Sequence, residues 1–373
     1  MKIWVIGRGF PTPENRMWGV FEYEQAKLLA RNGYEVCYIA LTMSFLSRKD
    51  PRGLRWFDRD GVHVVACSRL YFPGKLNIHL ERYEDECWRR IFDAAERDTG
   101  LPDAIHIHYP AMIGSTNEIE KYRQRGVKLY ATEHWSRVLN GNLKAHELAR
   151  LKYYAGHANC IACVGESLMD AVKRLTDAKV PLVIVPNIVS PVFFEAHRKA
   201  EDEGFTFLCV GRLVPLKQFD RVIRVFRTAF PEGNVRLEII GSGPERKALE
   251  RTVGGDGRIA LMGSLKLEQV AQEQARAQAL VSFSRYETFA APVAEAWACG
   301  KPTIVSAASG IAPYVNADNG IVVPADSTEA LGAAMRRLYD GYAGYSHEKI
   351  AGFARREFSD EAIFKKLEAM YAG

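Results

Sequence analysis

Two carboxylates in the stretch YETFAAPVAEAWACG stand where they could bind a phosphorylated, hydroxyl-rich ligand. Glu287 lies on the loop that follows the apolar strand ALVSFS, and Glu295 lies one turn into the helix that Pro292 opens. Free backbone N–H groups at a helix N-terminus bind anions such as phosphate. The residues that supply those groups are Thr288, Phe289, Ala290 and Ala291. Because carboxylates accept hydrogen bonds from hydroxyls, the combination suits a sugar joined to a phosphate.

A second group of charged residues follows another apolar strand, in FLCVGRLVPLKQFD. Gly211 ends the strand and lets a ligand approach the backbone, and Arg212 and Lys217 follow on the loop. A guanidinium and an ammonium at this spacing can bind a diphosphate, although loop cations are more often simply solvated. Further on, Gly241 and Gly243 form a strand-to-helix turn that fits a nucleotide site but is also typical of any α/β turn.

The first half of the chain offers histidines and a long connection that contains glycine. In AIHIHYP, His106 and His108 alternate along one strand and share a face, so they could bind a metal, but no third ligand is evident. His134 follows the strand KLYATE. The connection GRGFPTPENRMWG, which ends at Gly19, is long for a compact domain, and such loops usually serve a function.

The cysteines and the apolar runs limit the class of protein. Seven scattered cysteines, an odd number, do not resemble a secreted disulfide framework. Cys160 and Cys163 form a C-x-x-C, but their stretch is typical of a buried strand, and no second pair would complete a zinc site. No apolar run approaches the ~18–20 residues that span a bilayer, and the first residues are typical of a strand rather than a signal peptide. We therefore expect a cytoplasmic protein.

Positive charge is concentrated in the first half of the chain. The first 190 residues carry 27 Lys and Arg against 22 Asp and Glu, which accounts for the whole net charge of +5. Around Trp56 and Phe57, the segment 48–59 gathers the basic residues Arg48, Lys49, Arg52, Arg55 and Arg59. Basic residues mixed with aromatic ones suit an anionic membrane surface, and an ordinary solvated loop is the alternative. We expect no nucleic-acid partner.

Short apolar runs rich in β-branched residues alternate with helical patterns along the whole chain. This alternation predicts an α/β fold with two Rossmann-like, doubly wound domains. The pattern restarts after an irregular segment near residue 190, so we expect domains at 1–190 and 191–358. An amphipathic helix at 359–373, with Ser359 as its N-cap, follows. Two such domains facing each other would place a cleft at the carboxyl ends of their strands, where ligands bind.

Taken together, these stretches resemble glycosyltransferase family 4, whose members have the GT-B fold. The resemblance runs from the first strand to the last helix. It is most specific in YETFAAPVAEAWACGKPTI, which is similar to the family's E-x7-E element. VGRLVPLKQFD and IIGSGPE stand upstream of it in the family's order and spacing.

The resemblance implies a role for each matching residue. Arg212 and Lys217 would bind the donor diphosphate and stabilise the leaving group. Glu287 would hold the donor sugar, Glu295 the ribose hydroxyls, and His134 would lie near the reacting sugar. Residues that would shape the donor site through their backbone are Gly19, Gly211, Gly241, Gly243, Gly263, Leu265, Thr288, Phe289, Ala290 and Ala291. His108 is a candidate contact for the acceptor, and the last helix would pack back on the first domain.

Three positions depart from the family pattern. Ala290 and Gln218 stand where the family usually has glycine, and 187–190 reads N-I-V-S instead of N-G-V-D. A methyl group at position 290 would narrow the sugar pocket. The identity of the donor sugar therefore does not follow from the resemblance.

The activity that the resemblance implies is a retaining sugar transfer from a nucleotide sugar, with UDP favoured by family frequency. The acceptor would be a hydroxyl of a glycan or of a lipid-linked sugar, as in bacterial surface polysaccharide synthesis. Because Arg212, Lys217 and the helix N-terminus would stabilise the leaving group, we expect no metal and no cofactor. The alternatives are a GT-B sugar-nucleotide epimerase and a non-catalytic nucleotide-sugar binder. A dehydrogenase is disfavoured, because no strand precedes a full G-x-G-x-x-G.

Overall fold

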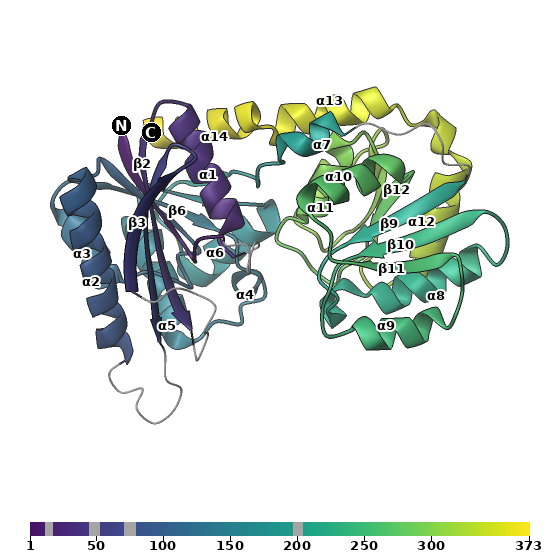
Figure 1. The fold of residues 1–373 in the computed structure, drawn as a ribbon, viewed down its shortest axis with the longest axis horizontal. Coiled ribbons are helices and arrows are strands. Elements are labelled where there is room, and N and C mark those ends of the chain that lie inside the picture. Colours follow the sequence, from purple (N-terminus) through teal and green to yellow (C-terminus); the bar gives the residue numbers. More distant parts are fainter. Residues whose placement is uncertain (12–17, 45–52, 71–79, 197–203) are drawn as a thin grey trace. The chain divides into compact units, whose positions relative to one another are not determined.

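The computed structural model describes residues 1–11, 18–44, 53–70, 80–196 and 204–373 (Figure 1). The chain divides into two compact units. Unit 1 consists of Met1–Ile188 together with Phe364–Gly373, and unit 2 consists of Val189–Ile363. Each unit has its own parallel sheet, so the predicted α/β fold with two Rossmann-like domains is confirmed.

Within the described residues of unit 1, eight strands form one sheet in the order β3-β4-β2-β1-β5-β6-β7-β8. The strands are β1 (Lys2–Gly7), β2 (Glu35–Ser44), β3 (Gly53–Arg59), β4 (Val62–Leu70), β5 (Ala104–His108), β6 (Lys128–Glu133), β7 (Cys160–Cys163) and β8 (Leu182–Ile184). The helices are α1 (Val20–Arg31), α2 (Leu80–Thr99), α3 (Thr116–Gln124), α4 (Ser136–Leu139), α5 (Ala145–His157) and α6 (Glu166–Thr176). Strand β5 is buried along its whole length, and β6 is buried except at its first residue, Lys128, because helices cover both faces of the sheet.

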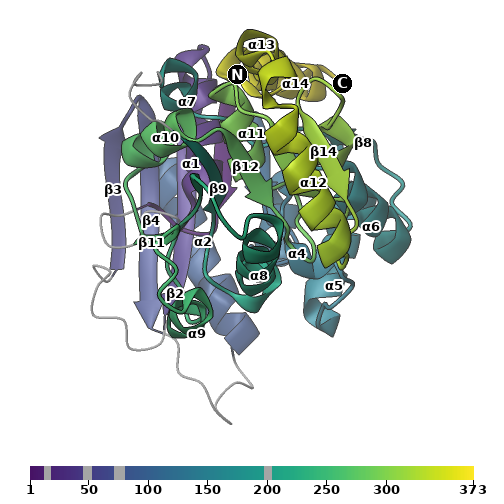
Figure 2. The same cartoon turned by 90° about the vertical axis from the view of Figure 1, so that its right-hand side faces the viewer.

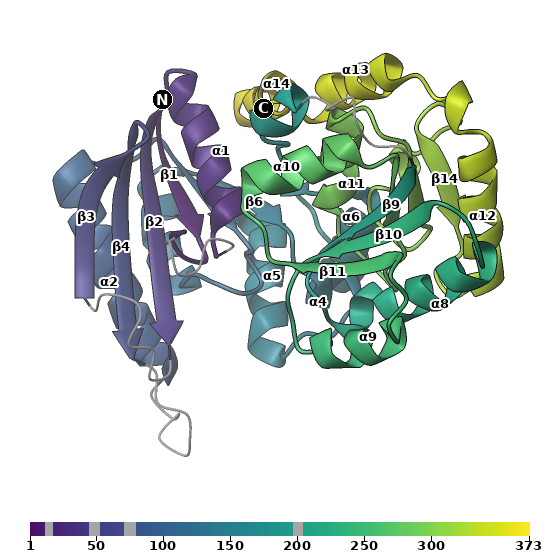
Figure 3. The ribbon, with the colours of Figure 1, turned by 45° about the vertical axis from the view of Figure 1, so that its right-hand side comes forward.

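One strand of unit 1 was not expected from the sequence. Gly53–Arg59, which we treated as part of a basic segment between strands, is the edge strand β3 and pairs with β4. The pairing is antiparallel, whereas the other strands of this sheet pair in parallel (Figure 3). A short turn at Asp60 and Gly61, both with positive φ, joins the two strands. Charged residues on an edge strand hinder pairing with another chain, which explains why so polar a segment can be a strand here.

Unit 2 has a six-stranded parallel sheet within its described residues, in the order β11-β10-β9-β12-β13-β14. The strands are β9 (Phe205–Val210), β10 (Val235–Ile240), β11 (Ile259–Gly263), β12 (Ala279–Ser282), β13 (Thr303–Ser306) and β14 (Gly320–Val323). The α-helices are α7 (Pro191–Glu195), α8 (Phe219–Ala229), α9 (Arg246–Val253), α10 (Leu267–Arg276), α11 (Ala291–Ala298), α12 (Thr328–Asp340) and α13 (His347–Phe358). Three short 3-10 helices are η2 (Pro215–Lys217), η3 (Ala312–Tyr314) and η4 (Tyr342–Gly344). Helices α8 and α12 lie side by side on the sheet and bury a core that includes Phe207, Phe226 and Leu338 (Figure 2).

Helix α14 (Asp360–Ala372) begins in unit 2 and ends in unit 1. Its predicted N-cap is confirmed, since the Ser359 hydroxyl accepts a hydrogen bond from the Ala362 N–H (3.3 Å). The predicted irregular segment before β9 contains the short helix α7, which starts with Pro191 at its first turn.

In both sheets the chain adds strands first on one side of the sheet's first strand and then on its other side, so the direction of winding changes at that strand. In unit 1 the chain builds β2, β4 and β3 on one side of β1, and then β5 to β8 on the other side. In unit 2 it builds β10 and β11 on one side of β9, and then β12 to β14 on the other. Loops at the carboxyl ends of the two strands at such a point diverge, and ligands of open α/β sheets bind between them.

In unit 2 the loop between β12 and α11 rests on the loop that follows β13. The Glu287 N–H donates to the Ala308 carbonyl (3.1 Å), and the Gly310 N–H donates to the Glu287 carbonyl (2.9 Å). A Cβ atom on Gly310 would lie 2.0 Å from the Thr288 carbonyl oxygen. The two loops therefore pack backbone against backbone, and only glycine fits at position 310.

Gly310→Ala should destabilise unit 2 by about 1–3 kcal/mol, because an extra methyl group in a filled space forces the backbone to move. Urea unfolding monitored by fluorescence checks this. Gly344→Ala is the matched control, since a Cβ at Gly344 meets no atom within 4 Å. Equal unfolding midpoints for the two variants would show that the loops can separate without cost.

Candidate active site

Backbone contacts between glycines join the strand ends of unit 2. The Gly211 N–H donates to the Ile240 carbonyl (2.9 Å), and the Gly241 N–H donates to the Gly263 carbonyl (2.8 Å), so the ends of β9, β10 and β11 are linked in turn. Gly241 has a φ of 147°, and a Cβ there would lie 1.8 Å from the Gly211 carbonyl oxygen. Glycine at 241 is thus required by the packing of two loops, whatever ligand they bind.

Two further residues of the predicted donor site also have packing roles. A Cβ on Gly243 would lie 2.3 Å from the Leu213 carbonyl oxygen, so this glycine too allows a close contact between loops. Leu265 packs on the apolar cluster of Leu208, Ile240 and Ala277. These contacts fix the shape of the turns after β10 and β11.

The structure brings Lys217 and Glu287 together, as expected for two residues of one site. Lys217 ends η2 after β9, and its ammonium forms an ion pair with the Glu287 carboxylate on the loop after β12. The Ser284 hydroxyl donates to the same carboxylate oxygen (2.7 Å). Both charged side chains are more than four-fifths buried, with 18% and 15% of their surfaces exposed. The pair therefore joins the two loops at the winding change of the sheet.

Arg212 lies on the same loop as Lys217 but is exposed. Among the described residues no carboxylate forms an ion pair with it. A guanidinium in this state keeps all its donors for an anion, so Arg212 can bind phosphate without first losing a partner.

The N-terminus of α11 is held in a fixed position. Ala290 precedes the helix with a φ of 76°, a left-handed conformation that is uncommon for a residue with a side chain. At the other end of the helix, the Trp297 indole N–H donates to the Thr303 hydroxyl (3.1 Å) and to the Asn319 carbonyl (3.0 Å). The free N–H groups at residues 289–291 therefore point in a direction that the core determines.

Glu295 lies in the middle of α11 and is partly buried. Burial raises the pKa of its carboxyl to about 7, although a hydrogen bond from Gln274 opposes the shift. The Gln274 amide on α10 donates to the carboxylate over 3.4 Å, and its own oxygen has no partner among the described residues. The carboxyl of Glu295 thus changes its charge close to neutral pH.

Gln218, which replaces a family glycine, has a φ of 52° and is buried. Its side-chain amide donates to the carbonyls of Phe283, after β12, and of Ala325, after β14, each over 3.0 Å. Gln218, next to Lys217, therefore ties the end of the loop after β9 to two other strand ends.

In unit 1, His108 and His134 form a hydrogen-bonded pair, with 2.9 Å between Nδ1 of His108 and Nε2 of His134. Both imidazoles are buried, and burial lowers their pKa values well below the ordinary value, so both rings are neutral at pH 7. Among the described residues, no group of three or more possible metal ligands gathers here or elsewhere. Cys160 and Cys163 lie in the buried strand β7, as predicted.

The sequence analysis missed several polar residues next to His134. Glu133 is fully buried and accepts hydrogen bonds from the backbone N–H groups of His134 (2.9 Å) and Trp135 (2.8 Å). Burial raises the pKa of its carboxyl to about 7. Arg8, directly after β1, forms an ion pair with the fully buried Glu22 on α1. A charged residue directly after an apolar strand was the signal that these positions offered.

Gly19 has a clear structural requirement. It precedes α1 with a φ of 79°, and a Cβ there would lie 2.0 Å from the Gly9 carbonyl oxygen. The Tyr38 hydroxyl donates to that same carbonyl (2.7 Å). Residues 12–17 of this connection lie outside the described residues, so the donor-closing role of Gly19 stays a prediction.

Only the second part of the basic segment 48–59, from Gly53 onward, lies within the described residues. Arg48, Lys49 and Arg52 lie outside the described residues. In β3, Trp56 and Leu54 lie on the face that α2 covers, whereas Phe57 contacts Phe10 on the opposite face (5.1 Å between ring centroids). The expectation that Trp56 and Phe57 share one basic patch is therefore wrong, because alternate residues of a strand point in opposite directions.

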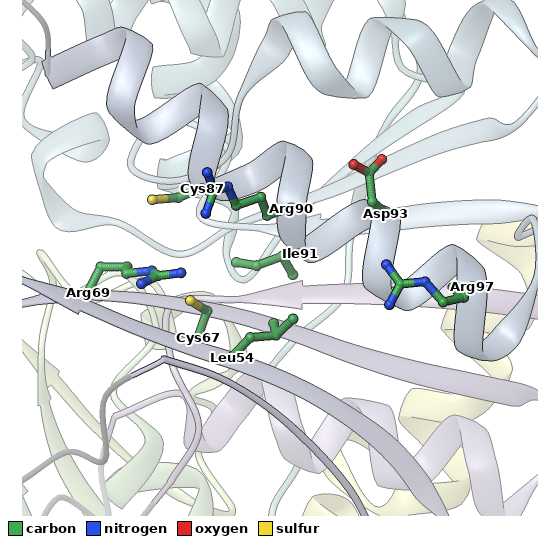
Figure 4. A pocket seen from close by; sticks show the side chains of 8 residues that line it. All are labelled: Leu54, Cys67, Arg69, Cys87, Arg90, Ile91, Asp93 and Arg97. Carbon is green, nitrogen blue, oxygen red and sulfur yellow. The ribbon is translucent and has the colours of Figure 1, made fainter.

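The face that carries Trp56 has its own basic residues. A pocket of about 280 Å³ lies between α2 and the strands β3 and β4 (Figure 4). Arg69 lies towards one end of the pocket and Arg97 and Asp93 towards the other. Its lining residues are Leu54, Cys67, Arg69, Cys87, Arg90, Ile91, Asp93 and Arg97. Trp56 on the neighbouring strand is 57% exposed. None of the described helices is both long and apolar enough to cross a bilayer.

Each half of the chain matches a known protein family. Residues 19–193 match Glycosyltransferase Family 4, and residues 204–341 match Glycosyl transferases group 1. An N-acetyl-alpha-D-glucosaminyl L-malate synthase from Bacillus anthracis is 22% identical over 95% of this chain and 93% of its own length. An exopolysaccharide phosphotransferase from Streptomyces coelicolor is 29% identical over 51% of this chain, but the match covers 20% of that protein.

The fold has close structural counterparts. A sucrose-phosphate synthase from Thermosynechococcus elongatus superposes with a TM-score of 0.78 and 20% identity, over 100% of this chain and 98% of that one. This likeness, together with the two parallel sheets, shows the GT-B fold that the sequence predicted. With both family matches in the expected order, the chain belongs to the family 4 glycosyltransferases, enzymes of polysaccharide and glycoconjugate synthesis.

Proposed function

We propose that this glycosyltransferase moves a sugar from a nucleotide sugar, with UDP as its nucleotide, to a hydroxyl of a glycan or lipid-linked acceptor, and retains the anomeric configuration. The observation that carries the proposal is the Lys217–Glu287 ion pair. It places a cation suited to phosphate against a carboxylate suited to sugar hydroxyls, which are the two groups that a nucleotide sugar joins.

The donor diphosphate is assigned to Arg212, Lys217 and the N-terminus of α11. Arg212 is exposed and offers its guanidinium, and the helix offers free N–H groups at residues 289–291. When the bond between sugar and phosphate breaks, negative charge grows on the phosphate, and fixed positive groups lower the barrier. The proposal gives this task to protein groups and includes no metal.

The remaining donor contacts follow from the positions of two carboxyls and one turn. Glu287, fixed by Lys217 and Ser284, accepts hydrogen bonds from the sugar hydroxyls. Glu295 accepts hydrogen bonds from the ribose, and the turn at 263–265 lies beside the base. Neither carboxylate serves as a nucleophile, since the acceptor attacks on the face that the phosphate leaves and the phosphate takes the acceptor's proton.

In unit 1 we assign His134 to the reacting sugar. Its imidazole is neutral at pH 7, so it acts through a hydrogen bond and not through charge. His108 is fully buried and bonded to His134. We therefore propose that His108 acts through His134 and does not touch the acceptor.

A donor screen tests the proposal as a whole. The protein is incubated with UDP-, GDP- and ADP-sugars, and nucleotide release is measured with and without glycan acceptors. We expect slow release from UDP-sugars alone and faster release with a suitable acceptor. Conversion of a UDP-sugar without an acceptor into its epimer would favour the epimerase, and absence of any turnover would favour the non-catalytic binder.

The donor-binding cations give the first prediction of this section. Arg212→Ala and Lys217→Ala should each lower kcat by at least ~100-fold, the scale of losing one charge-stabilising donor at a reacting centre. Arg224→Ala, on the exposed side of α8, is the control and should keep wild-type kcat. Near-normal turnover of either site variant would mean that the loop is merely solvated.

The carboxyl of Glu295 predicts a pH dependence. Its pKa of about 7 in the free enzyme means that it is protonated below neutral pH, where it accepts hydrogen bonds poorly. The kcat/KM for the donor should therefore rise as pH increases through about 7, since this ratio reports groups of the free enzyme. Glu295→Gln should lose this rise. If the rise persists in Glu295→Gln and disappears in Glu133→Gln, it belongs to Glu133.

We also propose that unit 1 attaches peripherally to an anionic membrane, at the cytoplasmic side. The support is an exposed Trp56 on the face that carries the arginines of the α2 pocket. In the sequence, the basic residues Arg48, Lys49 and Arg52 precede this strand. Aromatic rings at the headgroup level and Arg side chains near phosphates both favour such attachment. A lipid-linked acceptor would be presented at that surface.

Vesicle sedimentation tests the attachment. Wild type should bind vesicles that contain anionic lipid, and salt should weaken the binding, because each basic residue near the surface contributes about 1 kcal/mol. Changing Arg48, Lys49 and Arg52 to Ser, or Trp56 to Ser, should reduce the bound fraction. Arg236→Ser with Arg251→Ser, both exposed in unit 2, is the charge control. Wild type left in the supernatant at low salt would contradict the proposal and favour a soluble acceptor.

A further inference from the structure

A column of side chains in contact runs through unit 1 from Arg8 to Tyr371 and includes His134. Its members come from the loop after β1, from β5 and the residue after it, from the residue after β6 and from the last turn of α14. In order, they are Arg8, Tyr109, His134, His108, His106 and Tyr371.

The first end of the column is anchored by charge. The Arg8 guanidinium lies over the Tyr109 ring, 3.7 Å from its centroid, and the Tyr109 ring stacks on His134 at 4.7 Å. The fully buried Glu22 holds Arg8 through an Nε to Oε1 contact of 2.8 Å. Tyr109 has a φ of 54°, and a bulky residue with positive φ is a strained exception that its surroundings must hold in place.

The middle of the column consists of three imidazoles, of which His106 and His108 stack, whereas His108 and His134 meet edge to edge through their hydrogen bond. His108 stacks on His106 with 4.8 Å between ring centroids and 10° between planes. On its other side it bonds His134 and lies 5.2 Å from that ring. Nε2 of His108 has no partner among the described residues, so the bond to His134 is its one polar contact there. Packing against His106 is what keeps the His108 ring at the angle that this bond needs.

The second end of the column is anchored by a directional chain of hydrogen bonds. The side-chain nitrogen of Gln25 can only donate, and it lies 3.3 Å from Nδ1 of His106; the Gln25 side chain also hydrogen-bonds the Tyr371 hydroxyl. The Tyr371 hydroxyl therefore donates to Nδ1 of His106 (2.5 Å). The proton of His106 is then on Nε2, which donates to the Thr132 hydroxyl (2.7 Å). This chain fixes both the tautomer and the plane of the His106 ring.

We propose that Tyr371, in the last turn of α14, is a positioning residue for His134 and acts through His106 and His108. The inference rests on the proposed function, in which His134 lies at the reacting sugar. Tyr371 touches no substrate in this account. Its hydroxyl keeps His106 in one orientation, His106 supports the His108 ring, and His108 holds Nε2 of His134.

A purely structural role for Tyr371 makes a different prediction. The Tyr371 ring also packs on Tyr34, 6.0 Å away, and Tyr130 donates to the Tyr371 carbonyl, so loss of the whole side chain would disturb the fold. Tyr371→Phe removes the hydroxyl and keeps the ring. A residue that only stabilises the fold would change the unfolding temperature but not the state of the His134 ring.

The experiment compares Tyr371→Phe with Tyr34→Phe in the full-length protein. Tyr34→Phe is the matched control, because it removes a hydroxyl from a ring that packs on Tyr371 without touching His106. We expect Tyr371→Phe to lower kcat by about 10–100-fold, the cost of a small misplacement of a catalytic group. The donor KM should stay within about two-fold of wild type, since the residues assigned to the donor diphosphate and ribose are in unit 2 and Tyr371 touches no substrate. Long-range ¹H–¹⁵N spectra should show changed imidazole nitrogens for His134 in Tyr371→Phe and not in Tyr34→Phe.

The proposal is overturned if Tyr371→Phe keeps wild-type kcat, or if its His134 signals match those of wild type. His134→Asn separates this failure from that of the proposed function. If His134→Asn is fully active, the role of His134 is wrong and the inference falls with it; if it is inactive while Tyr371→Phe is normal, the inference alone fails. Should Tyr371→Phe not fold, Thr132→Val removes the other hydrogen bond of the same His106 ring and must give the same kcat loss and His134 shift.

Discussion

The ion pair between Lys217 and Glu287 is the interaction on which the rest of unit 2 depends. The two residues are 70 positions apart in the chain, and they meet because the strands that precede them are neighbours at the winding change of the sheet. Both are largely buried, so their attraction is screened less than that of a surface pair, and removal of either charge would leave the other without a partner. The ion pair therefore fixes the distance between the loops after β9 and β12 without the help of a ligand. The glycines at 241 and 310 extend this rigidity to the neighbouring turns, where backbone meets backbone.

At two positions where the family usually has glycine, this chain keeps a left-handed backbone conformation but carries a side chain. Ala290 and Gln218 both retain a left-handed conformation, which costs an ordinary residue about 1–2 kcal/mol. For Gln218 the two hydrogen bonds to carbonyls of other strand ends offset this cost. For Ala290 the described contacts offer no such compensation, apart from the rigid loop on which it lies. Ala290 lies two residues after Thr288, whose carbonyl oxygen leaves no room for a Cβ at Gly310.

Much of this arrangement could be predicted from the sequence, because it follows from local rules. The apolar runs predicted the parallel strands, and Pro292 predicted the start of α11. The structure brings Lys217 and Glu287 together, as the sequence predicted, while the grouping of Arg212 and Glu295 with them stays a prediction. Local rules failed where a long-range partner decides the outcome. Segment 53–59 is polar enough for a loop and becomes a strand only because β4 pairs with it, and that pairing then sends Trp56 and Phe57 to opposite faces. The contact between His106 and Tyr371 joins residues 265 positions apart, and no periodicity in the chain signals it.

The discontinuity of unit 1 has a consequence for how the molecule is made. Synthesis proceeds from the N-terminus, yet Phe364–Gly373 belongs to the first unit and is translated after Val189–Ile363, which forms the second. The sheet of unit 1 can assemble early, since its strands are contiguous up to Ile184, but the Tyr371 side of its buried histidines stays open until the whole of unit 2 has been made. Closing such a distant contact is slow compared with local folding, because the intervening chain must be ordered first. The newborn protein therefore passes through a stage in which its first half is folded while Tyr371 is not yet in place beside His106.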